Sequence, residues 1–342
     1  MALTGRALEP RILEAPPEGW DALLAADPNA TAAHTPALWR AFTAACPMRL
    51  AFVAAFEGGA PAGGAPVLIE RRAGLEWLRA LPMLLPAAPL SREGRREAVD
   101  DAVARGIGGL QRRLRVVGGE WAVYRAHDAP PGDAVLAACG GETRTLEAAC
   151  VDLAAGIAAA RRRMDRKTRQ DVRRASRRLR FEEAPAALEE AYALYVRQAR
   201  HWGAHRPLPL ELSRRLLAGD APPARLFTVR DARGLLSATL ALDGARETML
   251  WWSGSHPAAR HRGAFPFLLW SVVEWAAAAG RARVNLGASA GRSPVAEFKS
   301  SFGAHDVRYP VCWLDARYAA PPGRVVAALQ NRLRRGRDRG SA

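Results

Sequence analysis

The fold is decided by residues 226–253, LFTVRDARGLLSATLALDGARETMLWWS, in which three β-rich runs alternate with two turn signals. The runs are residues 226–230, 235–242 and 248–253. Asp243-Gly244, between two runs rich in apolar residues, is a strong hairpin signal. The stretch therefore predicts a three-strand antiparallel meander.

The residues that follow extend this pattern. A loop over 254–266 leads to an apolar helix over 267–279, Gly280 ends the helix, and residues 283–286 return as a strand. Meander, loop, helix and strand in this order are typical of the GNAT acyltransferase fold. The first half of the chain shows a weaker version, with a hairpin predicted over 50–56 and 66–70 and a helix over 92–114.

We therefore predict an α/β (α+β) chain of two tandem GNAT-like domains, each a mixed, mainly antiparallel sheet flanked by helices. The predicted domains are residues 1–150 and residues 151–320, with the acyl-transfer site in the second and a basic tail over 321–342. A length of 342 residues also favours two domains.

Composition narrows the classes of protein to consider. Hydrophobic residues make up 49% of the chain and charged residues 25%, as in globular proteins. The first 20 residues lack the apolar core of a secretory signal, and residues 265–279 are too short to span a bilayer, so we expect a cytoplasmic protein. The four cysteines show no CxxC or Cys/His spacing, so we expect neither a metal site nor a disulfide framework.

Lysine is scarce. Of 50 basic residues only Lys167 and Lys299 are lysines, in the segments DRKTRQDVRRA (165–175) and EFKSSFG (297–303). A compact ammonium and a planar guanidinium are not interchangeable, so these two positions are candidates for chemistry that arginine cannot perform. The alternative is an arginine-rich composition that left two lysines by chance.

The net charge of +16 favours a polyanionic partner such as RNA or an anionic membrane surface. Charge is densest over residues 153–181, where helical spacing predicts one basic face. The residues that we expect to contact donor phosphates are Arg166, Lys167, Arg169, Arg173 and Arg177. The alternative is an ordinary solvated helix face.

Three segments carry a family resemblance. KTRQDVRRASR (167–177), NLGAS (285–289) and FKSSFG (298–303) resemble the FemAB and FemX-like peptidyltransferases, as does the region of His34, Trp39 and Leu81-Pro82. The resemblance implies two GNAT-like domains and transfer of an amino acid from aminoacyl-tRNA to an amine of a peptidoglycan precursor, without coenzyme A. It places Phe298 and Lys299 beside the donor. Asn285 departs from the family, whose members more often have Asp at this position.

The cofactor loop supports a donor other than coenzyme A. GNAT enzymes that use acyl-CoA hold pyrophosphate on a Q/R-x-x-G-x-G/A loop, whereas this chain reads Arg260-His261-Arg262-Gly263-Ala264-Phe265. Phe265 replaces the last small residue, and Pro266 removes an N–H donor. We therefore expect no bound cofactor, with aminoacyl-tRNA as the donor substrate.

The chemistry that we expect is direct attack by an acceptor amine, because the chain has no nucleophile elbow. Lys299 is predicted to be an exposed or partly exposed catalytic residue that meets the oxyanion or the ribose-phosphate of the donor, with Phe298 as a packing face. Strand alternation separates Trp251 from Trp252, and we place Trp252, Arg260 and Asn285 in the substrate cleft. No general base can be identified.

The sequence thus predicts a FemAB-like acyltransferase that binds tRNA and an amine-bearing acceptor, a small molecule, peptide or cell-envelope precursor. A lipid-linked acceptor would bring the chain to a membrane surface. Two alternatives remain open: an acyl-CoA-dependent GNAT N-acyltransferase, and a non-catalytic RNA-binding or envelope-assembly module. The sequence does not indicate an oligomeric state.

Overall fold

The computed structural model describes residues 7–79, 85, 87–128, 130–137, 141–202, 206–289, 293–319, 321 and 323–325. The chain forms two compact units: Met1–Leu146 together with Arg308–Ala342, and Glu147–Val307. The second unit ends before residue 320, the predicted boundary, because strand β13 (His305–Leu314) pairs with β6 (Gly118–Ala122) of the first unit. Leu81-Pro82, Cys139 and most of the tail over 321–342 lie outside the described residues.

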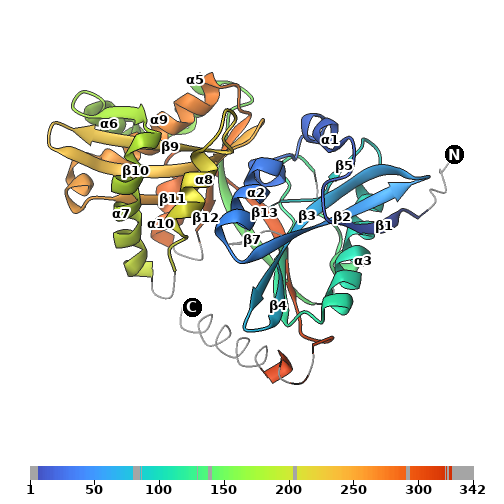
Figure 1. Cartoon of the computed structure of the whole chain (residues 1–342). Helices are drawn as coiled ribbons and strands as arrows, with labels where there is room; N and C mark the ends of the chain where they lie inside the picture. Colours follow the sequence, from blue (N-terminus) through green and yellow to red (C-terminus); the bar gives the residue numbers. More distant parts are fainter. Residues whose placement is uncertain are drawn as a thin grey trace. The chain divides into compact units, whose positions relative to one another are not determined.

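The first unit has a mainly antiparallel sheet (Figure 1). Its strand order is β1 (Glu9–Leu13), β2 (Met48–Glu57), β3 (Ala60–Arg72), β4 (Leu75–Arg79), β6 and β13, with β5 (Leu90–Ser91) paired to β3. The predicted hairpin is confirmed as β2 and β3, in which Leu50 lies opposite Leu68. The parallel pair is β4 with β6.

Helices cover this sheet. They are α1 (Trp20–Ala26), α2 (Pro36–Ala45), α3 (Arg96–Leu114) and α4 (Asp133–Ala137), with a short 3-10 helix, η1 (Ala32–His34). The buried face of α3 presents Val103 and Ile107 to Val53 and Val67 of the sheet, in one apolar core. Spacing of three and four residues put these side chains on one face, as the sequence predicted.

The second unit carries the predicted meander. Its strand order is β7 (Gly141–Asp152), β12 (Arg283–Ala288), β11 (Glu247–Ser255), β10 (Gly234–Asp243), β9 (Ala224–Asp231) and β8 (Arg180–Glu183). The strands from β8 to β11 pair antiparallel, whereas β11 and β12 pair parallel. The register shifts by one residue at a β-bulge, since Leu240 lies opposite Trp252 whereas Ala241 lies opposite Leu250.

Helices lie on both faces of this second sheet. They are α5 (Ile157–Arg163), α6 (Arg166–Ala175), α7 (Leu188–Ala199), α8 (Leu210–Leu217), α9 (Ala264–Ala278) and α10 (Ser293–Ser300), with 3-10 turns η3 (Pro185–Ala187), η4 (Arg200–Trp202) and η5 (Pro257–Arg262). Trp252 contacts Tyr195 of α7, whereas Phe227 contacts Trp275 of α9. Because side chains alternate along strands, α7 and α9 cover opposite faces.

The described helices include none that combines the length and the apolar character needed to cross a bilayer.

Candidate functional site

A wedge opens where β11 and β12 stop pairing. The two parallel strands are in register only at Glu247–Met249 and Arg283–Asn285, although β11 continues to Ser255 and β12 to Ala288. Ligands of parallel sheets commonly bind at the carboxyl ends of strands, where the backbone is free to receive them. The wedge is therefore a candidate ligand-binding site.

A pocket of about 750 Å³, called the wedge pocket below, lies along the end of β11. The side chains of β11 that line it are Ser253 and Ser255. The remaining lining residues are Arg197, Gln198, His201, His256, Pro257, Ala259, Phe265, Pro266 and Phe298. They come from α7, η4, η5, the first turn of α9 and α10, so segments spread over 100 residues of sequence meet here.

Helix α7 reaches the wedge pocket because Gly254 lets it approach the sheet. A Cβ on Gly254 would lie 2.3 Å from the main-chain N of Tyr195, which is closer than side-chain atoms ever come. The close approach brings Arg197, two residues further along α7, to the end of β11, where its Nη2 donates to the main-chain O of Ser255 at 3.2 Å.

Phe298 lies in the wall of the wedge pocket, and its place beside the donor stays a prediction. Its ring stacks on Phe265 at 5.8 Å between centroids with 23° between planes, and it contacts Phe302 edge-on at 5.1 Å. Phe265, which replaces the last small residue of the coenzyme A loop motif, therefore packs in this wall.

Lys299 lies on α10 and is only 8% exposed, so the expectation of an exposed or partly exposed lysine is wrong. Its Nζ donates to the main-chain O of Gly287 at 2.7 Å and of Ala288 at 2.8 Å. Burial lowers the pKa of Lys299 to about 8, and the nearby Asp306 only partly offsets this. The lysine thus fastens α10 to the end of β12.

Asn285 and Trp252 do not lie in an open cleft, contrary to the sequence-based assignment. Asn285 is fully buried on β12, where Nδ2 donates to Glu247 Oε1 at 3.2 Å and Oδ1 accepts from Gly287 N at 2.8 Å. Glu247 is also ion-paired with Arg283. A buried carboxylate needs such partners, which explains the amide at position 285.

Trp252 is 3% exposed and belongs to the core under α7 and α8. Its ring stacks on Tyr195 at 4.9 Å, and its Nε1 donates to Ser213 Oγ at 3.3 Å. The face of β11 that carries Trp252 is covered by helices, so this side chain does not reach a cleft. The side chain of Arg260, the third residue assigned to the cleft, lies outside the described part of the chain.

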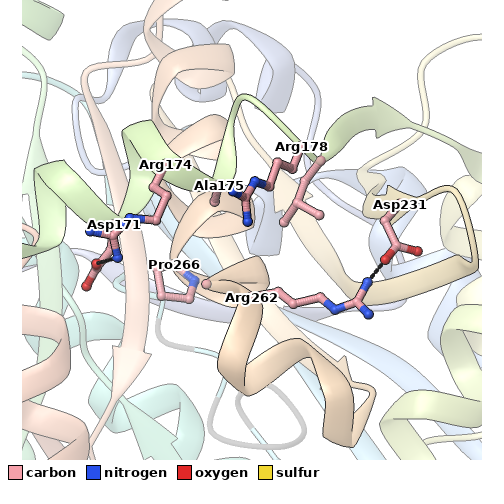
Figure 2. A pocket seen from close by; sticks show the side chains of 9 residues that line it. Asp171, Arg174, Ala175, Arg178, Asp231, Arg262 and Pro266 are labelled. Atoms are coloured by element: carbon pink, nitrogen blue, oxygen red, sulfur yellow. Dashed lines mark ion pairs between the residues drawn. The ribbon is translucent and has the colours of Figure 1, made fainter.

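A second pocket, of about 520 Å³ and called the arginine pocket below, also borders the first turn of α9 (Figure 2). The residues that line it are Asp171, Arg174, Ala175, Arg178, Leu179, Asp231, Arg262, Gly263 and Pro266. Gly263 precedes α9 with a φ of 65°, a left-handed conformation that suits glycine. Helix N-termini attract anions, although Pro266 lacks one of the N–H donors of this turn.

The three arginines of this pocket differ in their partners. Arg262 forms an ion pair with Asp231, drawn as a dashed line in Figure 2. Arg174 lies 3.6 Å from Asp171, with both side chains substantially exposed. No carboxylate within the described residues is bound to Arg178, which is exposed. The pocket therefore offers positive charge that no internal carboxylate neutralises fully.

The predicted basic face is only partly formed by a helix. Arg166, Lys167 and Arg173 are exposed on α6, and Arg177 is exposed beyond its end at Ala175. Arg169 is different, because its Nη1 donates to the main-chain O of Arg161 at 3.1 Å and of Arg162 at 3.3 Å. It caps the end of α5 rather than pointing to solvent, which sequence spacing could not indicate.

Sequence reasoning missed most residues of both pockets. Arg197 lies near the end of α7 and His201 follows four residues later in η4, a spacing of about one helical turn. Arg262-Gly263, which directly precedes an apolar helix, was compared with the pyrophosphate loop of acyl-CoA enzymes but was not assigned to a site. Arg174 and Arg178 had no signal beyond charge, since only the packing of α6 beside α9 places them in one pocket with Arg262 and Gly263.

Comparison with known proteins shows which family and which solved structures this chain resembles. Residues 158–300 match the family described as "Acetyltransferase (GNAT) domain". No curated protein matches the chain in sequence. The solved structure of FemX is similar over 93% of this chain and 100% of its own, with a TM-score of 0.69 and 10% identity.

Two further structures have the same fold. The C-terminal domain of a putative lysylphosphatidylglycerol synthetase from Agrobacterium fabrum is similar over 90% of this chain and 92% of its own, with a TM-score of 0.53 and 17% identity. A tandem GNAT protein from the clavulanic acid biosynthesis pathway is similar over 90% of this chain and 98% of its own, with a TM-score of 0.52 and 14% identity.

These likenesses confirm the predicted tandem GNAT-like fold. The family match confirms an acyltransferase domain over residues 158–300, which includes both pockets, Phe298 and Lys299.

Proposed function

We propose that this GNAT acyltransferase takes an aminoacyl group from the 3′ end of a tRNA and transfers it to an amine. The observation that carries the proposal is the origin of the arginine pocket. Two of its arginines, Arg174 and Arg178, belong to the same basic segment as the exposed Arg173 and Arg177. A polynucleotide bound along α6 would place its phosphates on both sets of arginines.

A polynucleotide uses such a surface better than a single small molecule does. Within the described residues, Asp171 is the one carboxylate ion-paired with an arginine of 166–178, at 3.6 Å from Arg174. Exposed arginines that lack internal partners can exchange counterions for phosphates, and each contact adds to the salt dependence of binding. The exposed residues Arg166, Lys167, Arg173 and Arg177 supply these contacts in this proposal, whereas Arg169 acts by holding α5.

The transfer reaction forms one bond and breaks another. The acceptor nitrogen attacks the ester carbonyl, a C–N bond forms, and the C–O bond to the ribose breaks, with the ribose hydroxyl as leaving group. A proton leaves the attacking nitrogen, and the ribose oxygen gains one. A positive charge that is already positioned beside the developing oxyanion before the reaction lowers the activation barrier.

Lys299 is the cation that we assign to this role. An ammonium has three N–H donors, and two of them bind Gly287 and Ala288 at the end of β12. The third is the donor that we assign to the oxyanion, and Phe298, the preceding residue, supplies an apolar wall of the wedge pocket. Lys299 thereby also keeps the strand end in place for the substrate.

Acyl-CoA is the second candidate donor, and one specific observation favours it. Gly263 and the first turn of α9 lie in the arginine pocket, where a pyrophosphate could meet Arg174, Arg178 and Arg262. The loss of an N–H donor at Pro266 and the bulk of Phe265 argue against tight binding. The two donors differ in how many phosphates bind outside the pocket.

Binding of an RNA hairpin that mimics a tRNA acceptor arm tests the proposal. Its affinity should fall steeply between about 50 and 200 mM salt, and Arg173→Gln with Arg177→Gln should reduce the log–log slope by about 1.5, for two phosphates. Arg214→Gln is the control, because that exposed arginine is already neutralised by Glu189 at 3.0 Å. It should leave the slope unchanged.

Calorimetry with acetyl-CoA tests the alternative donor. A Kd below about 100 µM, which corresponds to about 5.5 kcal/mol, together with no RNA binding at low salt, would replace the tRNA donor by acyl-CoA. RNA binding that is independent of salt would also contradict the proposal.

A further inference from the structure

The wedge pocket has a one-sided distribution of charge. Arg197 supplies its positive charge, His201 and His256 line it as well, and no Asp or Glu is among the described residues that line it. The arginine pocket, by contrast, includes Asp171 and Asp231. A basic wall without internal carboxylates is suited to an anionic ligand.

Arg197 is the central residue of this wall. It is half-buried, it has no carboxylate partner within the described residues, and its one hydrogen bond there goes to the main-chain O of Ser255 at 3.2 Å. A guanidinium carries five N–H donors in a planar fork that matches a carboxylate or a phosphate. A half-buried guanidinium with most donors unused is a site that an anion stabilises.

The two histidines supply further donors. The Nδ1 of His256 accepts from the main-chain N of Ala258 at 3.2 Å, so the ring proton lies on Nε2. His201 follows Arg197 by four residues, one helical turn further on. Both imidazoles therefore line the same pocket as the guanidinium, and both can donate to one anionic group.

The apolar residues that line the wedge pocket form a second part of its wall. Phe298 stacks on Phe265, and Pro257, Ala259 and Pro266 complete this wall. A ligand that fills the pocket would place hydrocarbon against the two rings and an anionic group against Arg197. A cationic ligand would meet positive charge and no acceptor carboxylate, so the pocket selects against it.

We propose that the wedge pocket binds a carboxylate or phosphate group of the acceptor, so that the amine that receives the acyl group belongs to an anionic molecule. Taking the occupant as the acceptor rests on the proposed function. The chemistry of the pocket wall, an anion beside an apolar segment, does not depend on which donor is used.

Matched small probes test the pocket without any donor. Ligand-observed NMR titrations would compare 4-phenylbutyrate and 3-phenylpropyl phosphate with 4-phenylbutylamine, which has a similar shape and the opposite charge. At least one anion should bind about tenfold tighter than the amine. Preference for one of the two anions then identifies the carboxylate or the phosphate as the group that the acceptor presents.

Variants assign the binding to the named residue. Arg197→Gln should weaken anion binding about tenfold, which is the loss of one charge-assisted contact of about 1.4 kcal/mol. Arg200→Gln is the matched control, since this exposed arginine lies three residues further on and does not line the pocket. Arg197→Lys keeps the charge, so it should retain part of the affinity even if the glutamine variant is poorly folded.

Three outcomes would overturn the inference: equal binding of the amine and the anions, no anion binding at about 10 mM probe, or equal losses in the Arg197 and Arg200 variants. None of these measurements requires RNA or turnover. A negative result here therefore leaves the proposed donor untouched, and failure of the RNA experiment leaves this pocket assignment untouched.

Discussion

The Nζ of Lys299 lies 2.7 Å from the main-chain oxygen of Gly287, which joins α10 to the end of β12. Gly287 has a φ of 76°, so the chain leaves the strand in a left-handed conformation at this point. The same ammonium also binds Ala288. One side chain thus holds the strand end beside the wedge pocket, in a place where sequence alone suggested a surface residue.

Replacement of Lys299 should affect both stability and activity. Lys299→Ala leaves two carbonyl groups without their donor, so we expect a loss of about 1–3 kcal/mol in the free energy of unfolding. It should also lower kcat/KM on the order of 100-fold, as expected for one preorganised electrostatic contact. Urea denaturation and a transfer assay measure the two effects separately.

Lys299→Arg keeps the charge but replaces a compact donor with a broad fork, so we expect it to lose much of the activity. Lys167→Arg is the control, because an exposed residue that contacts phosphates should tolerate arginine. If Lys299→Arg were fully active, the assignment of this residue to the oxyanion would be wrong, whatever its effect on stability.

The rate of transfer should depend on pH through Lys299. Its pKa in the folded protein is about 8, below the ordinary value of 10.5, because burial disfavours the charged form. The ammonium is therefore lost as pH rises through about 8, and a pH–rate profile should fall there. Lys299→Arg should remove this limb, since arginine stays protonated.

The contribution of Lys299 to the free energy of unfolding changes with pH in the opposite direction to the predicted activity. Between a pKa of about 8 in the folded state and 10.5 in the unfolded state, the unfolded chain binds more protons, so this residue raises stability as pH increases. Below about 8 both states are protonated and the contribution no longer changes. A decline in activity above pH 8 that tracks unfolding would contradict the catalytic interpretation.

Two glycine variants should have opposite effects on stability. Gly254→Ala places a Cβ at 2.3 Å from the main-chain N of Tyr195, so α7 must move away from β11, and we expect a loss of at least about 2 kcal/mol. Gly109→Ala lies in α3 with no atom within 4 Å of the new Cβ, and should stabilise by about 0.5–1 kcal/mol through helix propensity. Chemical denaturation compares them directly.

The Gly254 variant should also weaken anion binding in the wedge pocket, because Arg197 moves with α7. Equal stability of the two glycine variants would show that α7 does not depend on this close approach.

Asn285→Asp tests why this chain has an amide at a position where the FemAB resemblance implies an acid. The new carboxylate would face Glu247, whose Oε1 accepts from Asn285 Nδ2 at 3.2 Å. Two buried carboxylates repel each other, so we expect a loss of about 2–4 kcal/mol at pH 7 and a smaller loss at pH 5, where one of them binds a proton more readily. A loss that does not change with pH would contradict this explanation.

Much of the fold was predictable because its signals are local. The Asp243-Gly244 turn, the alternation along 235–242 and the apolar helix before Gly280 each act within a few residues, and the structure has the corresponding hairpin, meander and helix. Residues 298 and 299 were also singled out from sequence, through a motif and the scarcity of lysine, and Phe298 lines the wedge pocket. The catalytic role of Lys299 stays a prediction.

The remaining features depend on contacts that close over long distances in sequence. Trp252 has the periodicity of a strand residue, but only the packing of α7 and α8 shows that its face is covered. Arg169 has the spacing of a surface arginine, yet it caps α5. In both cases the sequence predicts the face of the strand or helix on which the side chain lies. Which segments pack against that face is known only from the folded structure.

By itself, then, the sequence determined the order of strands and helices, the basic character of residues 153–181 and the two lysine positions. The tertiary structure decided that Arg197, His201 and His256 share one pocket with Phe298, and that Lys299 is buried against Gly287. The reason is physical. Turn chemistry and periodicity are properties of adjacent residues, whereas burial, desolvation and hydrogen-bond partners are properties of segments up to 100 residues apart.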